Sequence, residues 1–285
     1  MADSSKLWTH HPSEVLRFRP GDRTEDVDTN SSPGFSGKRE DGEAVLAERS
    51  GRFAELQEML YANGKEGDRR SLLLVLQGMD TAGKGGIVTH VVGAGNPMGI
   101  RYTSFGKPTP EERSHHFLWR INKALPPAGH IGVFDRSHYE DVLVVRVHEL
   151  VPPDQIDHRY GEINTFEKEL VESGTTVVKA AMFVSLDEQK RRLAERLDRP
   201  EKYWKYNPGD LDERELWPAY QEAYQVMLDR TATDDAPWFV VPCDKKWYAR
   251  LAITELLIEA LTRMNLSWPP ADFDVDAEKE RLAKA

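Results

Sequence analysis

The residues with the clearest chemical signature lie between Gly78 and Gly86. They fit the spacing G-x-x-x-x-G-K of a phosphate-binding loop, with Lys84 as its lysine. Glycines let consecutive backbone N–H groups converge on an anion, and the lysine adds a mobile positive charge. The alternative is a chance glycine turn between a strand and a helix. The phosphate-binding residues expected here are Gly78, Thr81, Ala82, Gly83, Lys84, Gly85 and Gly86.

The loop departs from the usual pattern at the residue after its lysine. A Ser or Thr normally stands there to hold Mg²⁺, but this chain has Gly85. A metal must therefore find oxygen ligands elsewhere, and Asp80 is the nearest carboxylate in the loop. Asp80 has a second potential role, to orient or deprotonate an attacking phosphate oxygen. The sequence leaves both roles open.

A short apolar stretch at residues 130–134 is followed by a second acidic loop, which begins with Asp135, Arg136 and Ser137. In phosphate-loop enzymes an acid at this place holds Mg²⁺ directly or through water. Arg136 is then positioned to neutralise charge on a phosphoryl group in transfer. The alternative is an ordinary turn in which Asp135 caps the next helix and Arg136 is solvated.

A third cluster of charge lies at residues 190–205, where basic residues outnumber acidic ones. Arg192, Arg196 and Arg199 are three or four residues apart, which places them on one helical face. We expect this helix to belong to a mobile lid whose arginines reach the phosphates. A solvated charged helix is the alternative. Tyr203 and Trp204 either pack on a nucleotide base or anchor the lid.

Strands and helices alternate along the chain, which predicts an α/β fold with a central parallel five-stranded sheet between two layers of helices. The expected strands are 72–76, 100–105, 130–134, 175–185 and 238–241. The expected helices are 43–61, 87–92, 111–125, 139–150, 154–173, 187–198, 213–231 and 247–264, with an irregular segment at 201–212. Ligands of such sheets bind at the carboxyl ends of the strands, so Gly78 and Asp135 should share one edge.

The 285 residues suffice for one large domain. We expect an N-terminal arm at 1–42, extended and partly disordered or wrapped on the domain, then a kinase-like domain at 43–266 with its lid at about 187–214, and a tail at 267–285. The net charge of −10 argues against a binder of duplex nucleic acid. A single cysteine, Cys243, the lack of a signal-peptide pattern and the lack of a long apolar run predict a cytoplasmic protein without membrane association.

Five motifs together resemble the polyphosphate kinase 2 family: QGMDTAGKGG, FLWRINKALP, FDRSHYEDVLVVRVHEL, RLAERLDRPEKYWKY and APWFVVPCDKKWYARLAI. The resemblance runs from about residue 43 to 261. It implies a P-loop kinase fold with a helical lid, and Mg²⁺-dependent phosphoryl transfer, with Mn²⁺ as the alternative metal. By matching motif it implies catalytic roles for Asp80, Lys84, Asp135, Arg136 and Arg196, with Asp80 and Asp135 at the metal. It also implies a polyphosphate channel near Arg101, Lys107 and Arg120.

The predicted function is therefore reversible transfer of the terminal phosphate of inorganic polyphosphate to a nucleotide. The stretch HYEDVLVVRVHEL resembles the subgroup that phosphorylates both nucleoside mono- and diphosphates, which implies AMP as well as ADP as acceptors, with guanine nucleotides as a second class. A homo-oligomer, dimer or tetramer, is expected. The alternatives are an ATP-dependent nucleotide or small-molecule kinase, and a regulator that binds nucleotides or polyanions without turnover. Two carboxylates placed to hold a metal argue against the regulator.

Overall fold

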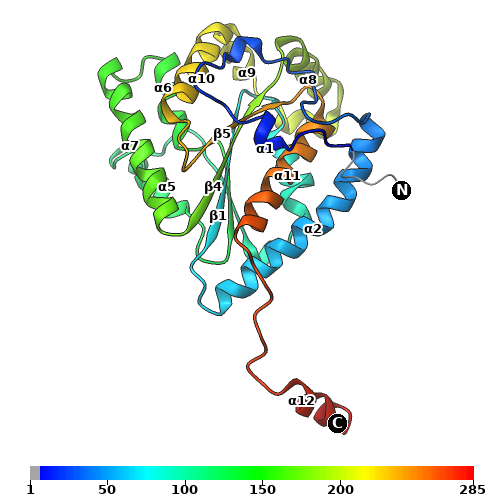
Figure 1. Cartoon of the computed structure of the whole chain (residues 1–285). Coiled ribbons are helices and arrows are strands. Elements are labelled where there is room, and N and C mark those ends of the chain that lie inside the picture. The colour runs from blue at the N-terminus through cyan, green and yellow to red at the C-terminus, as the bar shows by residue number, and fades with distance from the viewer. Residues whose placement is uncertain (1–6) are drawn as a thin grey trace.

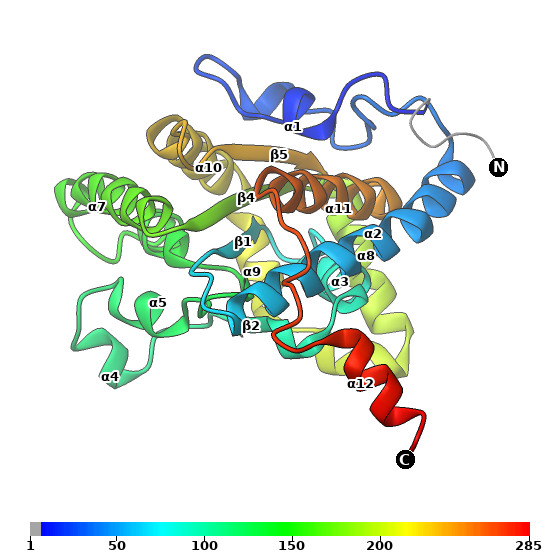
Figure 2. The same cartoon turned by 60° about the horizontal axis from the view of Figure 1, so that its bottom comes forward.

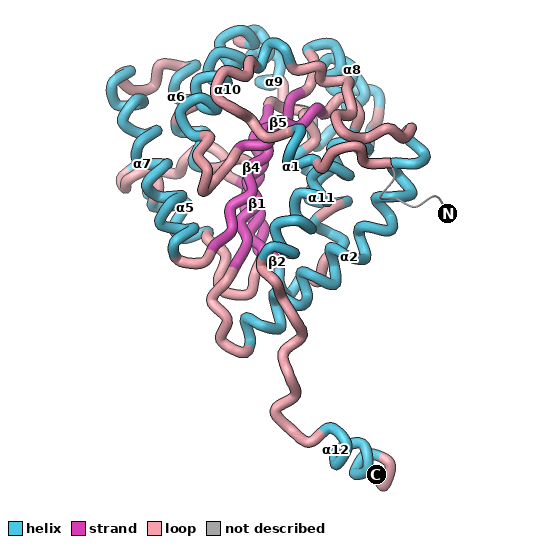
Figure 3. The backbone as a smooth tube through the Cα atoms, in the orientation of Figure 1, coloured by secondary structure: helices cyan, strands magenta, loops and turns pink. Residues whose placement is uncertain are grey.

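The core of the molecule is a sheet of five parallel strands in the order β2-β3-β1-β4-β5. The computed structural model describes residues 7–285, and Figures 1 and 3 show the sheet running through its centre. The strands are β1 Ser71–Gly78, β2 Ile100–Ser104, β3 Ile131–Asp135, β4 Thr175–Phe183 and β5 Trp238–Pro242. Every residue of β1 is buried, as expected for the middle strand of a parallel sheet. The predicted sheet is confirmed.

Alternate residues of β1 face two different layers of helices. Leu72, Leu74 and Leu76 belong to one apolar cluster, whereas Leu73 and Val75 belong to the other. The first cluster is closed by α2 Arg39–Lys65, α3 Lys84–His90 and α11 Lys246–Arg263, and the second by α5 Trp119–Ala124, α7 Pro153–Glu172 and α10 Trp217–Thr231. Figure 2 shows the two layers on opposite faces of the sheet. The three-layer α/β/α prediction is therefore correct.

The register of the sheet brings the two predicted loops together. Leu76 of β1 lies opposite Asp135 of β3, and Gly78 lies opposite Met182 of β4. Because all five strands are parallel, their carboxyl ends meet at one edge. The phosphate-binding loop and the Asp135 loop therefore leave the same edge of the sheet.

Three predicted helices are wrong because each is broken, and the first two lie before α7. The helix expected at 111–125 is α4 Pro110–Arg113 followed by α5, and the gap at 114–118 begins with Ser114, His115 and His116, which are poor helix formers. The helix expected at 139–150 is a 3₁₀ turn, η5 His138–Asp141, followed by the single turn α6 Val144–Val147. Its run of β-branched valines lowers helix propensity.

Other boundaries moved by a few residues. Helix α2 starts four residues before its expected start and continues through the Asn63-Gly64 pair that was expected to end it. The helix expected at 213–231 is divided, because α9 Gly209–Glu215 ends before α10 begins at Trp217, with a proline in its first turn. Two short 3₁₀ turns, η3 Val92–Ala94 and η4 Pro97–Gly99, lie between α3 and β2.

The predicted lid consists of three short elements above the carboxyl edge of the sheet (Figure 1). They are α8 Leu186–Asp198, η6 Pro200–Lys205 and α9 Gly209–Glu215. The segment expected to be irregular thus contains η6 and the start of α9. Together the three elements cover the loops that carry the predicted chemistry.

The described part of the N-terminal arm wraps around the domain. It contains α1 Pro12–Val15 and η2 Thr24–Asp26, and it bonds to the outer edge of β5. Phe18 N donates to Trp238 O at 2.9 Å, and Val240 N donates to Leu16 O at 2.7 Å. Both arm side chains are buried. The arm therefore covers one edge of the sheet.

The C-terminal tail leaves the body at the end of the sheet opposite the lid, as Figures 1 and 2 show. Its backbone is held at Ser267, whose carbonyl accepts a bond from Asn63 Nδ2 at 2.8 Å. Every residue from 270 to 285 is exposed, including α12 Val275–Leu282. Among the described residues no helix is both long and apolar enough to cross a membrane.

Candidate active site

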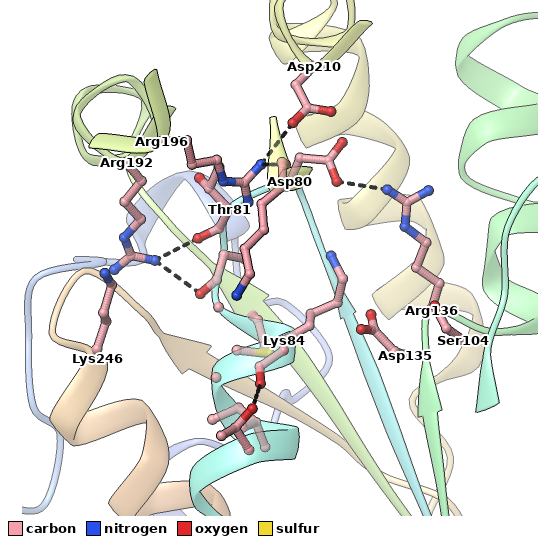
Figure 4. A pocket seen from close by; sticks show the side chains of 18 of the residues that line it. Asp80, Thr81, Lys84, Ser104, Asp135, Arg136, Arg192, Arg196, Asp210 and Lys246 are labelled. Atoms are coloured by element: carbon pink, nitrogen blue, oxygen red, sulfur yellow. Dashed lines mark hydrogen bonds and ion pairs between the residues drawn. The ribbon is translucent and has the colours of Figure 1, made fainter. Parts of the chain in front are cut away.

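A cavity of about 780 Å³ opens at the carboxyl edge of the sheet, between the phosphate-binding loop, the end of β3, the lid and α11. Figure 4 shows side chains from all four converging on it. The five residues predicted to be catalytic all line this cavity: Asp80, Lys84, Asp135, Arg136 and Arg196. Residues far apart in the sequence therefore meet in one concave, charged site.

The phosphate-binding loop has the backbone that its glycines predict. Gly83 has φ +114°, which only glycine adopts easily, and α3 begins at the next residue. A Cβ on Gly78 would come within 2.7 Å of the Met182 carbonyl oxygen, so this position has no room for a side chain. Thr81 also has a positive φ, +68°, and its buried hydroxyl has no hydrogen-bond partner among the described residues.

Lys84 lies folded over its own loop. Its ammonium donates to Gly78 O at 2.6 Å and lies 3.4 Å from Met79 O, and the residue is 8% exposed. These two carbonyls accept only some of the hydrogen bonds that the ammonium can donate, because the group has three N–H donors. Phosphate oxygens entering the loop would compete with them for the same ammonium.

Asp80 and Arg136 form an ion pair across the mouth of the loop, with 2.7 Å between Oδ1 and Nη2. Burial by itself would raise the pKa of Asp80, but the charges of Lys84 and Arg136 outweigh burial and lower it. Asp80 is therefore ionised at neutral pH. Arg136 has φ +64°, so the turn after β3 points its guanidinium back at the first loop.

Glu140 lies behind Arg136 and was not predicted as a site residue. Its carboxylate is 3.9 Å from Arg136 Nη1 and accepts a hydrogen bond from Gln77 Nε2. Burial raises the pKa of Glu140, although Arg136 opposes the shift. The sequence offered one signal that could have found it, the position of Glu140 four residues after Arg136 in the same loop.

Asp80 and Asp135 are the two carboxylates that the sequence predicts at a Mg²⁺ site. Both carboxylates line the cavity, and Asp135 Oδ2 accepts a bond from the Tyr102 hydroxyl at 3.3 Å. Among residues 7–285 no group of three or more acidic, His or Cys side chains could hold a metal by itself. Mg²⁺ is commonly held by one or two carboxylates plus substrate phosphates and water. The donor set therefore matches this metal.

The three lid arginines have different environments. Arg192 is 4% exposed, and its guanidinium donates to Glu188 Oε1 at 2.7 Å, to Thr81 O at 2.8 Å and to Cys243 O at 2.5 Å. It therefore braces the phosphate-binding loop from outside. Arg199 does not line the cavity and pairs with Glu195 and Glu201. Of the three, only Arg196 lines the cavity without a hydrogen bond to the phosphate-binding loop (Figure 4).

The three residues of the expected channel line a neighbouring cavity of about 370 Å³. It adjoins the first cavity, because Ser104, Phe105 and Gly106 line both. Arg120 is buried and donates to Gly106 O at 2.9 Å, so it shapes the wall. Arg101 and Lys107 are exposed. The lining residues are Arg101, Thr103, Ser104, Phe105, Gly106, Lys107, Thr109, Glu112, Arg120, Lys123 and Ala124.

The opposite side of the main cavity carries cations that were not predicted. They come from the lid and from α11: Lys202, Lys205, Lys246 and Arg250. His90 of α3 also lines the cavity, but burial and the charge of Arg250 lower the pKa of its imidazole, so it is neutral at neutral pH. Burial and the charge of Arg192 lower the pKa of Lys246. The Lys245-Lys246 pair follows the carboxyl end of β5, so the rule that ligands bind at strand ends could have identified it.

Comparisons with known proteins agree with this geometry. The family model described as "Polyphosphate kinase 2" matches residues 36–268. The chain is 42% identical to the AMP/ADP-polyphosphate phosphotransferase of Meiothermus ruber, over 90% of this chain and 91% of that one. It is 39% identical to the ADP-polyphosphate phosphotransferase of Rhodopseudomonas palustris, over 90% and 92%. The crystal structure of polyphosphate kinase 2 from Arthrobacter aurescens TC1 is 53% identical and covers 98% of both chains with a TM-score of 0.95.

Proposed function

This chain belongs to the polyphosphate kinase 2 family, and we propose that it transfers the terminal phosphate of inorganic polyphosphate to ADP and to AMP in a reversible, Mg²⁺-dependent reaction. The convergence of Asp80, Lys84, Arg136 and Arg196 on one cavity is the observation that carries this proposal. The M. ruber relative is named for both AMP and ADP, which supports both acceptors.

In the proposed reaction a terminal oxygen of the nucleotide attacks the last phosphorus of polyphosphate in line. One P–O bond forms to the nucleotide, and the P–O bond to the shortened polyphosphate breaks. Lys84, Arg136 and Arg196 neutralise negative charge as it spreads over the phosphoryl oxygens. Asp80 and Asp135 would hold Mg²⁺, which would neutralise further phosphate charge.

We assign the two substrates to the two sides of the cavity. Polyphosphate is a continuous line of negative charge, and the cations on the lid and α11 side fit such a chain. The neighbouring cavity is smaller and combines Arg101, Lys107 and Lys123 with hydroxyl groups, which fits a nucleotide. This assignment moves Arg101 and Lys107 from the expected polyphosphate channel to the nucleotide side.

The assignment is tested by a matched pair of substitutions, Lys246→Gln and Lys123→Gln. Each removes one cation from one side. Lys246→Gln should raise the apparent KM for polyphosphate several-fold and leave that for ADP unchanged, whereas Lys123→Gln should do the reverse. If both variants affect the same substrate, the two sides are not divided in this way.

We also propose a homo-oligomer in which the tail contacts a second copy of the chain. Helix α12 has eight residues, and an isolated helix of that length is marginal in water. Trp268, Phe273 and Leu282 on the tail are all more than half exposed. Ending the chain at Leu266 should lower the number of chains per particle, as obtained from the molar mass in light scattering. An unchanged number of chains would contradict the role of the tail.

We place the enzyme in the cytoplasm. Its one cysteine, Cys243, is free and buried, which suits a reducing compartment. Guanine nucleotides are proposed as additional acceptors, in keeping with the subgroup that the sequence resembles.

The function is tested by mixing purified protein, Mg²⁺, polyphosphate and ADP, without ATP, and detecting ATP by luminescence. AMP and GDP are tested in separate reactions. We expect ATP from ADP and polyphosphate, and none when polyphosphate or Mg²⁺ is omitted. Phosphorylation that requires ATP as donor would favour the ATP-dependent kinase, and binding of ADP without product would favour the regulator.

A further inference from the structure

Asp210 is a buried acid of the lid that faces the active-site cavity. It lies near the start of α9, is 6% exposed and lines the cavity. Burial raises the pKa of Asp210, and the nearby charge of Asp80 adds to the shift. A carboxylate in such a place is costly unless a specific partner needs it. Neither the sequence motifs nor the reaction described above uses this residue.

The partner of Asp210 is Arg196. Arg196 Nη1 donates to Asp210 Oδ2 at 3.1 Å and to Lys205 O at 2.8 Å. Arg196 belongs to α8, Lys205 ends η6 and Asp210 belongs to α9, so all three lid elements meet at one guanidinium. Figure 4 shows Asp210 above Arg196, with Asp80 next to it.

Asp80 is a competing partner for the same arginine. Both side chains line the cavity, and Figure 4 shows Asp80 next to Arg196. Asp80 is already paired with Arg136 at 2.7 Å. Without a counter-charge on the lid, Arg196 would be drawn to Asp80 and would obstruct the carboxylate that is needed for the metal. Two acids and two arginines thus form separate pairs around the cavity.

We propose that Asp210 is a positioning residue that holds Arg196 at the place where the transferring phosphoryl group passes and keeps it away from Asp80. This inference rests on the proposed function, because it assigns Arg196 to the phosphate in transfer. Misplacing a preorganised charge by about an ångström is enough to cost a large part of its effect on the rate.

The test is a double-mutant cycle of Asp210→Asn, Arg196→Ala and the combined variant, with kcat and KM measured for polyphosphate and ADP. Asp210→Asn should lower kcat on the order of 10-fold or more by analogy with other positioning groups, while KM for polyphosphate stays equal or falls, because a negative charge near the phosphates is removed. In the Arg196→Ala background the same change should alter kcat less than about twofold, since its partner is absent. Asp210→Glu should restore part of the activity.

The matched control is Asp212→Asn, the same substitution at an exposed position of α9, which should leave kcat and KM at the values of the unmodified protein. An equal loss from Asp210→Asn with and without Arg196 would overturn the inference, as would no loss in the otherwise unmodified protein. A loss seen mainly as weaker polyphosphate binding would also overturn it.

Calorimetric titration of the same four proteins with tripolyphosphate separates this inference from the proposed function. Absence of phosphoryl transfer by the unmodified protein would contradict the function. The binding cycle would still report on the pair, because Arg196→Ala should weaken tripolyphosphate binding less when Asp210 is already Asn. Additive effects in that cycle would overturn the coupling.

Discussion

At the scale of single residues, Thr81 is held in an unfavourable state within the phosphate-binding loop. A β-branched residue with φ +68° is strained, and its buried hydroxyl has no hydrogen-bond partner among the described residues. Strain and an unpaired polar atom tend to persist at sites that bind a ligand. The loop lacks the hydroxyl that usually follows the lysine, because residue 85 is glycine. We predict that the Thr81 hydroxyl gains a partner when a phosphate oxygen or a metal-bound water enters the loop.

Thr81→Val removes this hydroxyl with little change in shape. We expect the free energy of unfolding to rise by about 1 kcal/mol, because an unpaired buried hydroxyl is replaced by a methyl group. The apparent KM for polyphosphate should rise several-fold, since a hydrogen bond to substrate is lost. Chemical denaturation and steady-state kinetics measure the two effects. A lower free energy of unfolding combined with an unchanged KM for polyphosphate would show that the hydroxyl stabilises the fold and does not bind substrate.

At the scale of elements, helix α8 is the part of the lid that contacts the phosphate-binding loop. The predicted face of three arginines is divided because α8 ends at Asp198, and Arg199 has an extended backbone that no longer follows the helical period. Arg192 binds carbonyls on the loop and after β5, and Arg196 bonds within the lid. One helix thus holds the loop with one turn and presents a charge to the cavity with the next.

Arg192→Lys keeps the charge but loses the planar set of donors. We expect the free energy of unfolding to fall by about 2–4 kcal/mol, because several buried carbonyls and Glu188 lose their partner. Turnover should fall as well, since the loop loses its brace. The control is Arg199→Lys, at a half-exposed position outside the cavity. Its free energy of unfolding should stay within about 0.5 kcal/mol of that of the unmodified protein. Equal stability of both variants in urea would contradict the bracing role.

The ion pairs of Glu188 make the stability of α8 depend on pH. Hydrogen bonds from Arg191 lower the pKa of Glu188 to about 2, with Arg192 contributing to the same shift against the effect of burial. Because the pKa is lower in the folded than in the unfolded protein, this group stabilises the fold above its unfolded pKa of about 4.5, and that stability is lost as the pH falls towards 2.

Glu188→Gln should therefore lower the free energy of unfolding at pH 7 by on the order of 1–3 kcal/mol. The difference between variant and unmodified protein should shrink as the pH is lowered from 4.5 towards 2. Denaturant titrations at several pH values measure this difference. A difference that stays constant across that range would show that the ionised carboxylate is not the stabilising form.

At the scale of the whole molecule, local patterns predicted the strands and both loops well. Each buried strand and each turn motif is continuous in sequence, and the parallel sheet then brings Gly78 and Asp135 to one edge. Asp210 could not be recognised in the same way, because only the packing of the lid over that edge places it in the cavity. The broken helix after Asp135 was missed because the bonds that hold it are tertiary: Tyr139 donates to Glu167 of α7 at 2.7 Å.

Net charge and cavity charge have opposite signs in this molecule. The chain carries −10 overall, yet lysines and arginines of the lid and α11 line one side of the cavity. Attraction of polyphosphate should therefore be local and sensitive to screening. Raising the salt from 0.05 to 0.2 M should increase the apparent KM for polyphosphate several-fold, by counterion release, and affect kcat little. A KM independent of salt would contradict the assignment of polyphosphate to this side.

The central claim is direct transfer of a phosphoryl group from polyphosphate to a nucleotide at the phosphate-binding loop. It is tested most directly by incubating radiolabelled polyphosphate with unlabelled ADP and Mg²⁺, and separating the products by chromatography. We predict that label appears in the terminal phosphate of ATP, and that Lys84→Ala reduces this transfer by ~10²-fold or more while the circular dichroism spectrum stays unchanged. Label released only as free phosphate, or undiminished transfer by Lys84→Ala, would contradict the account.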